Sequence, residues 1–148
     1  MVEINRSAPA TASGELDIAA SAEVVWDVIS DIEAWPSWNQ DVRTARLEGP
    51  LAVGSVFRWR AGGASLTSTL RVVDPPRELS WSGRTTGIRA IHVFRFEPND
   101  GGTLARSEES WEGLVPTLLR GYSRRILDRG IRGVLRLVKE EAERRAGA

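Results

Sequence analysis

The sequence predicts one α+β domain in which a strongly curved antiparallel sheet of about seven strands packs against a long C-terminal helix. Three patterns indicate this: a strand and two short helices within 15–38, β-prone stretches separated by turn residues over 41–112, and an apolar stripe at helical spacing over 115–145. An amphipathic helix and a sheet bury their apolar faces against each other, which gives two layers. A chain of 148 residues has the length of one domain.

Composition excludes several classes of function. The chain is 41% hydrophobic and 27% charged, which is typical of a folded domain rather than a disordered one. Lys plus Arg and Asp plus Glu each total 20, so no net positive field would attract nucleic acid. Cys is absent and His92 is the single histidine, which disfavours thiolate, multi-histidine and iron–sulfur metal sites. No glycine-rich phosphate loop is present, and we expect neither a metal nor a cofactor.

The N-terminal part divides into a lead-in and the start of the domain. Residues 1–13 are small and polar and predict a flexible lead-in, with the domain spanning 14–148. The lead-in has no apolar segment typical of a signal or transit peptide, and no apolar run in the chain approaches the ~18 residues of a membrane span, so a cytoplasmic location is expected. Polar and apolar residues alternate from Glu15 to Ala19, as in a half-buried strand. Ser21 then predicts a helix N-cap, and Pro36 ends a second short helix.

The middle and end of the chain predict the meander and the long helix. Short links containing Gly, Pro, Asn or Asp join antiparallel neighbours, since parallel strands need longer crossovers. The predicted strands lie near 41–48, 54–61, 65–73, 77–83, 88–97 and 103–112. A continuous helix over 115–145 would be ~45 Å long, enough to cross the sheet.

Several spaced segments resemble a known superfamily. They are SAEVVW at 21–26, SDIEAWPSWN at 30–39, VDPPREL at 73–79, FRFEP at 94–98 and ESWEG at 109–113. Over about residues 15–145 the chain resembles the START/Bet v 1-like (SRPBCC) superfamily, specifically its polyketide cyclase/dehydrase-like branch. The resemblance implies a helix-grip fold with a cavity between sheet and helix. It also implies a small hydrophobic ligand, aromatic or polyketide-like, which the protein would bind and, as a further expectation, cyclise or dehydrate by acid–base chemistry. The alternative is non-catalytic binding or transport of a lipid, quinone or isoprenoid.

The catalytic candidates are His92 and Glu109. His92 shares the alternation of Phe94 and Phe96, and Glu109 shares that of small or apolar residues on the next strand, so both are expected to face the interior. A turn over 99–102 would pair His92 with Ser107 and leave Glu109 diagonal to His92. On this interpretation His92 shuttles a proton while Glu109 fixes its tautomer. The alternative is that His92 only hydrogen-bonds Ser107 or a ligand hydroxyl, while Glu109 pairs with an arginine.

Large aromatic side chains are the ligand-binding candidates. Their rings offer apolar area together with an N–H or O–H donor, although ordinary core packing remains an alternative. The predicted ligand-binding residues are Trp38, Trp59, Trp81, Phe94 and Trp111, together with Leu118 and Tyr122 at the start of the long helix.

The C-terminal helix also carries concentrated positive charge. Residues 120–139 hold seven basic residues against the single acid Asp128. A basic amphipathic helix of this kind predicts contact with an anionic membrane surface, or else forms a solvated face. We expect a monomer or homodimer.

Overall fold

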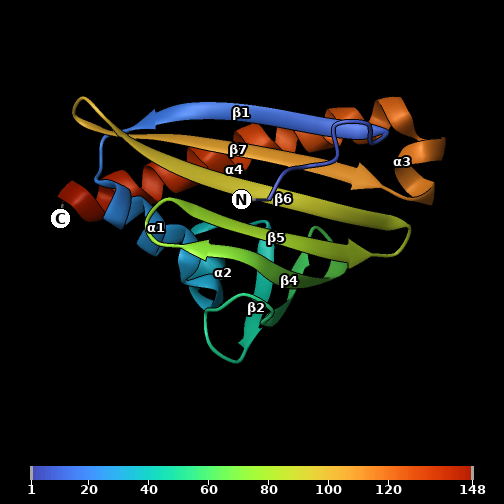
Figure 1. Cartoon of the computed structure of the whole chain (residues 1–148), viewed down its shortest axis with the longest axis horizontal. Coiled ribbons are helices and arrows are strands. Elements are labelled where there is room, and N and C mark those ends of the chain that lie inside the picture. Colours follow the sequence, from blue (N-terminus) through green and yellow to red (C-terminus); the bar gives the residue numbers. More distant parts are fainter. Residues whose placement is uncertain (1, 148) are drawn as a thin grey trace.

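The computed structural model describes residues 2–147; Met1 and Ala148 lie outside the described residues. The strands form a single seven-stranded sheet (Figure 1). They are β1 (Ala10–Ile18), β2 (Val42–Glu48), β3 (Val56–Ala61), β4 (Ala64–Asp74), β5 (Glu78–Thr85), β6 (Ile88–Asn99) and β7 (Gly102–Glu112). The helices are α1 (Ala22–Ser30), the 3-10 helix η1 (Ile32–Ala34), α2 (Trp35–Trp38), α3 (Leu114–Leu118) and α4 (Arg120–Gly147).

The sheet confirms the predicted fold class. Its order is β1-β7-β6-β5-β4-β3-β2 with every pair antiparallel, so β2 to β7 form a meander and β1 closes it beside β7. Helix α4 crosses one face, packing mainly on β1, α1 and β7, and α1 and α3 lie toward opposite ends of the sheet (Figure 1). This is the helix-grip arrangement, and it defines a concave face that α4 only partly covers.

The close approach of α4 depends on one glycine in β1. A Cβ at Gly14 would lie 3.3 Å from side-chain carbons of both Ile131 and Leu135, which is tighter than ordinary van der Waals contact. The absent side chain therefore lets the buried stripe of α4 rest directly on β1. The stripe comprises Ser123, Leu127, Ile131, Leu135, Val138 and Ala142.

The structure corrects three predicted boundaries. β1 begins at Ala10, so residues 10–13 of the predicted lead-in pair with β7. The turn between β6 and β7 contains only Asp100 and Gly101, because Asn99 and Gly102 still pair. The predicted continuous helix is broken at Leu119, which is non-helical at φ −118° and ψ 52°, and this separates α3 from α4.

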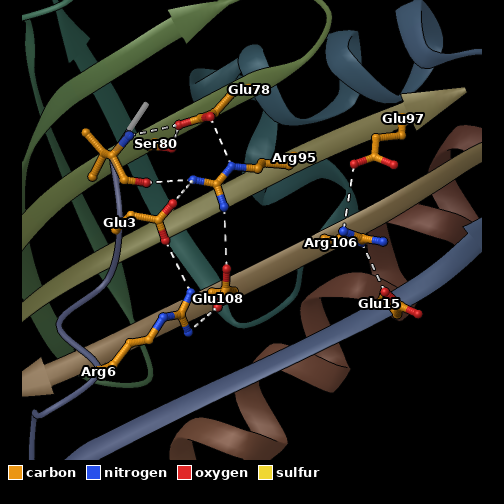
Figure 2. A network of polar contacts seen from close by, with 10 residues as sticks. Glu3, Arg6, Glu15, Glu78, Ser80, Arg95, Glu97, Arg106 and Glu108 are labelled. Carbon is orange, nitrogen blue, oxygen red and sulfur yellow. Dashed lines mark hydrogen bonds and ion pairs between the residues drawn. The ribbon is translucent and has the colours of Figure 1, made fainter.

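Arg95 organises a polar network on the outer, convex face of β5–β7 (Figure 2). It donates to Oε1 of Glu78 at 3.0 Å, to Oε1 of Glu108 at 3.4 Å and to the carbonyl oxygen of Val2 at 2.7 Å. Glu78 is buried, and a buried carboxylate without such a partner would be strongly destabilising. The network therefore fastens the N-terminal segment behind the strands whose concave face carries the candidate site.

Candidate functional site

His92 and Glu109 are directly opposite each other on β6 and β7. The register predicted from a four-residue turn was wrong by two residues, because the actual turn is two residues long. Ser107 is instead opposite Phe94, and it becomes the diagonal neighbour of His92. The buried neighbour Phe94 shows that this alternation faces the core.

Four side chains form a continuous series of polar contacts. The indole Nε1 of Trp111 donates to Oε2 of Glu109 at 2.9 Å, and Oε1 of Glu109 lies 3.4 Å from Nδ1 of His92. Nε2 of His92 is 2.9 Å from Oγ of Ser107. The alternative contact between His92 and Ser107 is thus present together with the His92–Glu109 pair. Among residues 2–147 Glu109 forms no ion pair with an arginine.

Burial shifts the two ionisations in opposite directions. Desolvation lowers the pKa of His92 to about 3, because the imidazolium would lose its hydration. Desolvation also raises the pKa of Glu109 to about 7, although the hydrogen bond from Trp111 opposes this shift. Below pH 7 the carboxyl of Glu109 is therefore protonated beside a neutral His92. Glu109 rather than His92 is therefore the group whose pKa lies near neutrality.

These shifts predict a specific pH dependence of stability. Unfolding lets Glu109 ionise at its ordinary pKa of 4.5, so its contribution to the free energy of unfolding is retained below pH 4.5 and lost as pH rises through about 7. His92 acts in the opposite sense, since its contribution is retained above pH 6.5 and lost as pH falls toward about 3. The wild type loses the Glu109 contribution as pH rises, whereas Glu109→Gln has no carboxyl to ionise. We therefore expect the free energy of unfolding of Glu109→Gln, relative to that of the wild type, to increase by on the order of 3 kcal/mol from pH 5 to pH 8. Urea unfolding at several pH values measures the difference.

Glu97 provides the matched control for this measurement. It is an exposed carboxylate on β6. The free energy of unfolding of Glu97→Gln should therefore change with pH in the same way as that of the wild type over this range. Parallel curves for Glu109→Gln as well would show that Glu109 does not titrate with a raised pKa.

A small cavity lies beside His92 on the concave face. Its volume is about 40 Å³, far below the ~300–1,000 Å³ of typical ligand pockets. The lining residues are Ile29, Trp35, Trp38, Asn39, Val42, Trp59, Trp81, His92, Phe94 and Val134. The expected open hollow is thus largely filled by aromatic side chains, including Trp35, whose ring centroid lies 5.5 Å from that of Trp81. A larger ligand requires some of these side chains to move.

The concave face is less covered toward α3. Inward-facing residues there, such as Leu66, Gly83, Ala90 and Trp111, are half-buried, whereas Phe94 and Phe96 farther along are fully buried. These half-buried residues are neighbours of His92 and Glu109 on the adjoining strands, so this end of the concave face is the more open side of the candidate site.

The predicted ligand-binding residues divide into two groups. Trp38, Trp59, Trp81 and Phe94 line the cavity, and Trp111 lies next to Glu109. Leu118 and Tyr122 do not line it: Leu118 ends α3, Tyr122 lies in the first turn of α4, and they are 72% and 63% exposed. The predicted set did not include five other residues that line the cavity: Ile29, Trp35, Asn39, Val42 and Val134. They come from separate parts of the chain, and no local sequence pattern connects them. Ser107 was predicted only as a hydrogen-bond partner of His92, and that contact is present.

Trp38 has a buried donor without an acceptor. Among the described side chains, its Nε1 is one of two buried polar atoms that lack a hydrogen-bond partner. The corresponding atom of Trp59 donates to Oγ of Ser68 at 3.1 Å. An unsatisfied donor beside a cavity is available to a ligand oxygen.

Residues 9–143 match the family model described as polyketide cyclase/dehydrase and lipid transport. The chain belongs to this family. The match confirms the resemblance seen in the spaced sequence segments. No curated protein matches the chain in sequence.

Solved structures show the same fold. The Zhui aromatase/cyclase from a Streptomyces species superposes with a TM-score of 0.80 at 19% identity, over 91% of this chain and 94% of that one. The di-domain aromatase/cyclase StfQ of the steffimycin biosynthetic pathway gives 0.78 at 19% identity, over 95% of this chain. The chain spans only 53% of StfQ. Ara h 8.0201 gives 0.72 at 12% identity, covering 89% of this chain and 96% of that one. These similarities establish the fold.

Among residues 2–147, no three acidic or histidine side chains come together as a metal site would require. No helix in this range is long and apolar enough to cross a bilayer.

Proposed function

We propose that this protein binds a hydrophobic, oxygen-bearing ligand of the aromatic polyketide type on its concave face and catalyses its cyclisation or dehydration with Glu109 as acid–base. The observation that supports this most directly is the buried Glu109–His92–Ser107 series, whose His92 lines the cavity. A carboxyl with a pKa of about 7 both accepts and donates a proton readily at neutral pH.

The chemistry requires only proton transfers. In dehydration of a β-hydroxyketone, the C–H bond next to the carbonyl breaks, a C=C bond forms, and the hydroxyl leaves with a proton as water. His92 lines the cavity and its Nδ1 lies 3.4 Å from Oε1 of Glu109, so the imidazole would carry a proton between Glu109 and the ligand. The indole N–H of Trp38 would bind the ligand carbonyl on which negative charge develops.

Reconstitution with a minimal polyketide synthase that releases a reactive poly-β-ketone tests the proposal. Chromatography of the products with and without this protein is expected to show a shift from spontaneously cyclised mixtures to one dominant aromatic product. An unchanged product distribution, together with unchanged ketone consumption, would contradict catalysis.

Non-catalytic binding of a lipid, quinone or isoprenoid is the second candidate. The exposed apolar residues where α3 meets α4 favour it, because they adjoin the less covered end of the concave face. Tight binding of a quinone without any product shift would support this candidate. A cytoplasmic location and a monomeric or dimeric state stay predictions.

Replacing Trp38 with Phe tests the ligand-binding role of its N–H. Because this donor has no partner in the free protein, Trp38→Phe should leave the free energy of unfolding unchanged or slightly higher. We expect roughly five- to tenfold weaker binding of 1,8-dihydroxyanthraquinone, the equivalent of about one hydrogen bond. Fluorescence titration and urea unfolding measure the two effects.

Trp59→Phe is the matched control. It leaves Ser68 without the indole donor and should lower the free energy of unfolding by about 1 kcal/mol. A stability loss of the same size in Trp38→Phe, without weaker binding, would show that the Trp38 donor has a structural rather than a ligand-binding role.

A further inference from the structure

The junction of α3 and α4 exposes a concentrated apolar surface. We define the apolar corner as Leu114, Leu118, Leu119 and Tyr122, whose exposures are 67%, 72%, 53% and 63%. Among residues 2–147, Val53 is the one other large hydrophobic residue with comparable exposure. Four such side chains within nine residues form a patch, and exposed apolar patches mark interaction surfaces.

The apolar corner is held in place by α3. Pro116 is buried, and the backbone N–H of Val115 donates to the carbonyl oxygen of Gly87 at 3.1 Å. A Cβ at Gly87 would lie 2.7 Å from Cγ2 of Val115, so the β5–β6 turn and α3 fit closely. Because Val115 and Pro116 face the sheet, Leu114 and Leu118 point outward from a fixed base.

Positive charge without acidic partners gathers at the same end of α4. Within the described chain, Arg120, Arg125 and Arg129 form no ion pair, and Arg124 donates to the carbonyl oxygen of Pro9. Farther along α4 the cations are paired: Arg132 with Asp128 at 3.2 Å, and Lys139 with Glu143 at 2.6 Å. The structure therefore confines the uncompensated charge to the part of α4 that adjoins the apolar corner.

We propose that the apolar corner docks on an anionic lipid bilayer. Leucine side chains on a protruding turn fit the acyl region, a tyrosine fits the headgroup level, and arginines at the rim meet lipid phosphates. A protein partner would need a matching cavity for a convex, largely aliphatic corner, whereas a fluid bilayer adapts to it. This inference does not depend on catalysis by Glu109, and it narrows the membrane contact expected from the whole basic helix to one end of it.

Co-sedimentation of the full chain with vesicles tests this docking. We expect binding at low salt to phosphatidylcholine vesicles that contain 30% phosphatidylglycerol. Binding to vesicles of pure phosphatidylcholine should be at least ~tenfold weaker. The double variant Leu118→Asp/Leu119→Asp should reduce partitioning into the anionic vesicles by at least ~tenfold. Arg120→Gln/Arg125→Gln should abolish most of the preference for anionic lipid.

Val53→Asp is the control, because it introduces an aspartate at an exposed hydrophobic residue outside the corner. It should bind like the wild type, and thermal unfolding confirms that each variant is folded. Absence of wild-type binding to the anionic vesicles would overturn the proposal. Equal losses in Val53→Asp and the double variant would also overturn it, as would binding that depends on the arginines alone.

Discussion

Replacing Glu109 with Gln is expected to lower the rate of poly-β-ketone cyclisation by roughly 10²–10⁴-fold. Gln keeps the size of the protonated carboxyl, and its amide oxygen still accepts from Trp111 while its NH₂ donates to Nδ1 of His92. Only the exchangeable proton is lost. The buried series Glu109–His92–Ser107 would then retain its geometry without a group that titrates near pH 7.

Product chromatography and ligand titration distinguish catalysis from binding in this variant. Affinity for 1,8-dihydroxyanthraquinone should change less than threefold, since His92 and Trp38 still line the cavity. Glu97→Gln, an exposed amide substitution on β6, should retain full activity. Wild-type product formation by Glu109→Gln would exclude the proposed acid–base role, and His92→Gln would then identify any remaining contribution of the imidazole.

Replacing Gly102 with Ala is expected to destabilise the fold by about 3 kcal/mol or more. A Cβ at Gly102 would overlap the backbone carbonyl oxygen of Ile18 and lie 3.2 Å from Cα of Ala19. Backbone atoms cannot rotate away as a flexible side chain can, so β1 must separate from the start of β7. Urea unfolding should show a lower midpoint. A stability within 1 kcal/mol of the wild type would contradict this close packing.

Gly130→Ala is the same chemical change, but we expect it to raise rather than lower the free energy of unfolding. A Cβ at Gly130 meets no atom within 4 Å, and the residue lies inside α4. Alanine should stabilise the helix by up to about 1 kcal/mol, because glycine loses more backbone entropy on folding. If Gly130→Ala were as destabilising as Gly102→Ala, steric overlap with Ile18 would not account for the Gly102 effect.

The alternation of side chains along β6 and β7 predicted which residues of the candidate site face the core. The observed strand register then corrected which of them are opposite each other. Alternation placed His92, Phe94 and Glu109 on one face, and this holds because side chains on a strand point to opposite faces in turn. The pairing across β6 and β7 depends on which turn residues remain paired. Gly101 adopts φ +84° beside Asp100, and this two-residue turn moved Glu109 from a diagonal to a direct neighbour of His92.

Tertiary packing determined the environment of several aromatic and apolar side chains that local sequence patterns could not distinguish. Trp38 and Trp59 both satisfied the criteria for a cavity wall, yet only the positions of their neighbours show that one N–H is bonded and the other free. The apolar spacing of Leu118 and Tyr122 fitted a continuous helix. The helix is instead interrupted at the non-helical Leu119, and both side chains are exposed as part of the apolar corner.

The sequence by itself determined the α+β class, the meander of strands and the amphipathic character of the terminal helix, because periodicity and turn residues act over short distances along the chain. The tertiary structure alone decided the small size of the cavity, the opposite pKa shifts of His92 and Glu109, and the exposure of the apolar corner. Each of these depends on atoms far apart in sequence that burial brings within contact. Desolvation and packing are properties of that assembled environment and not of any single segment.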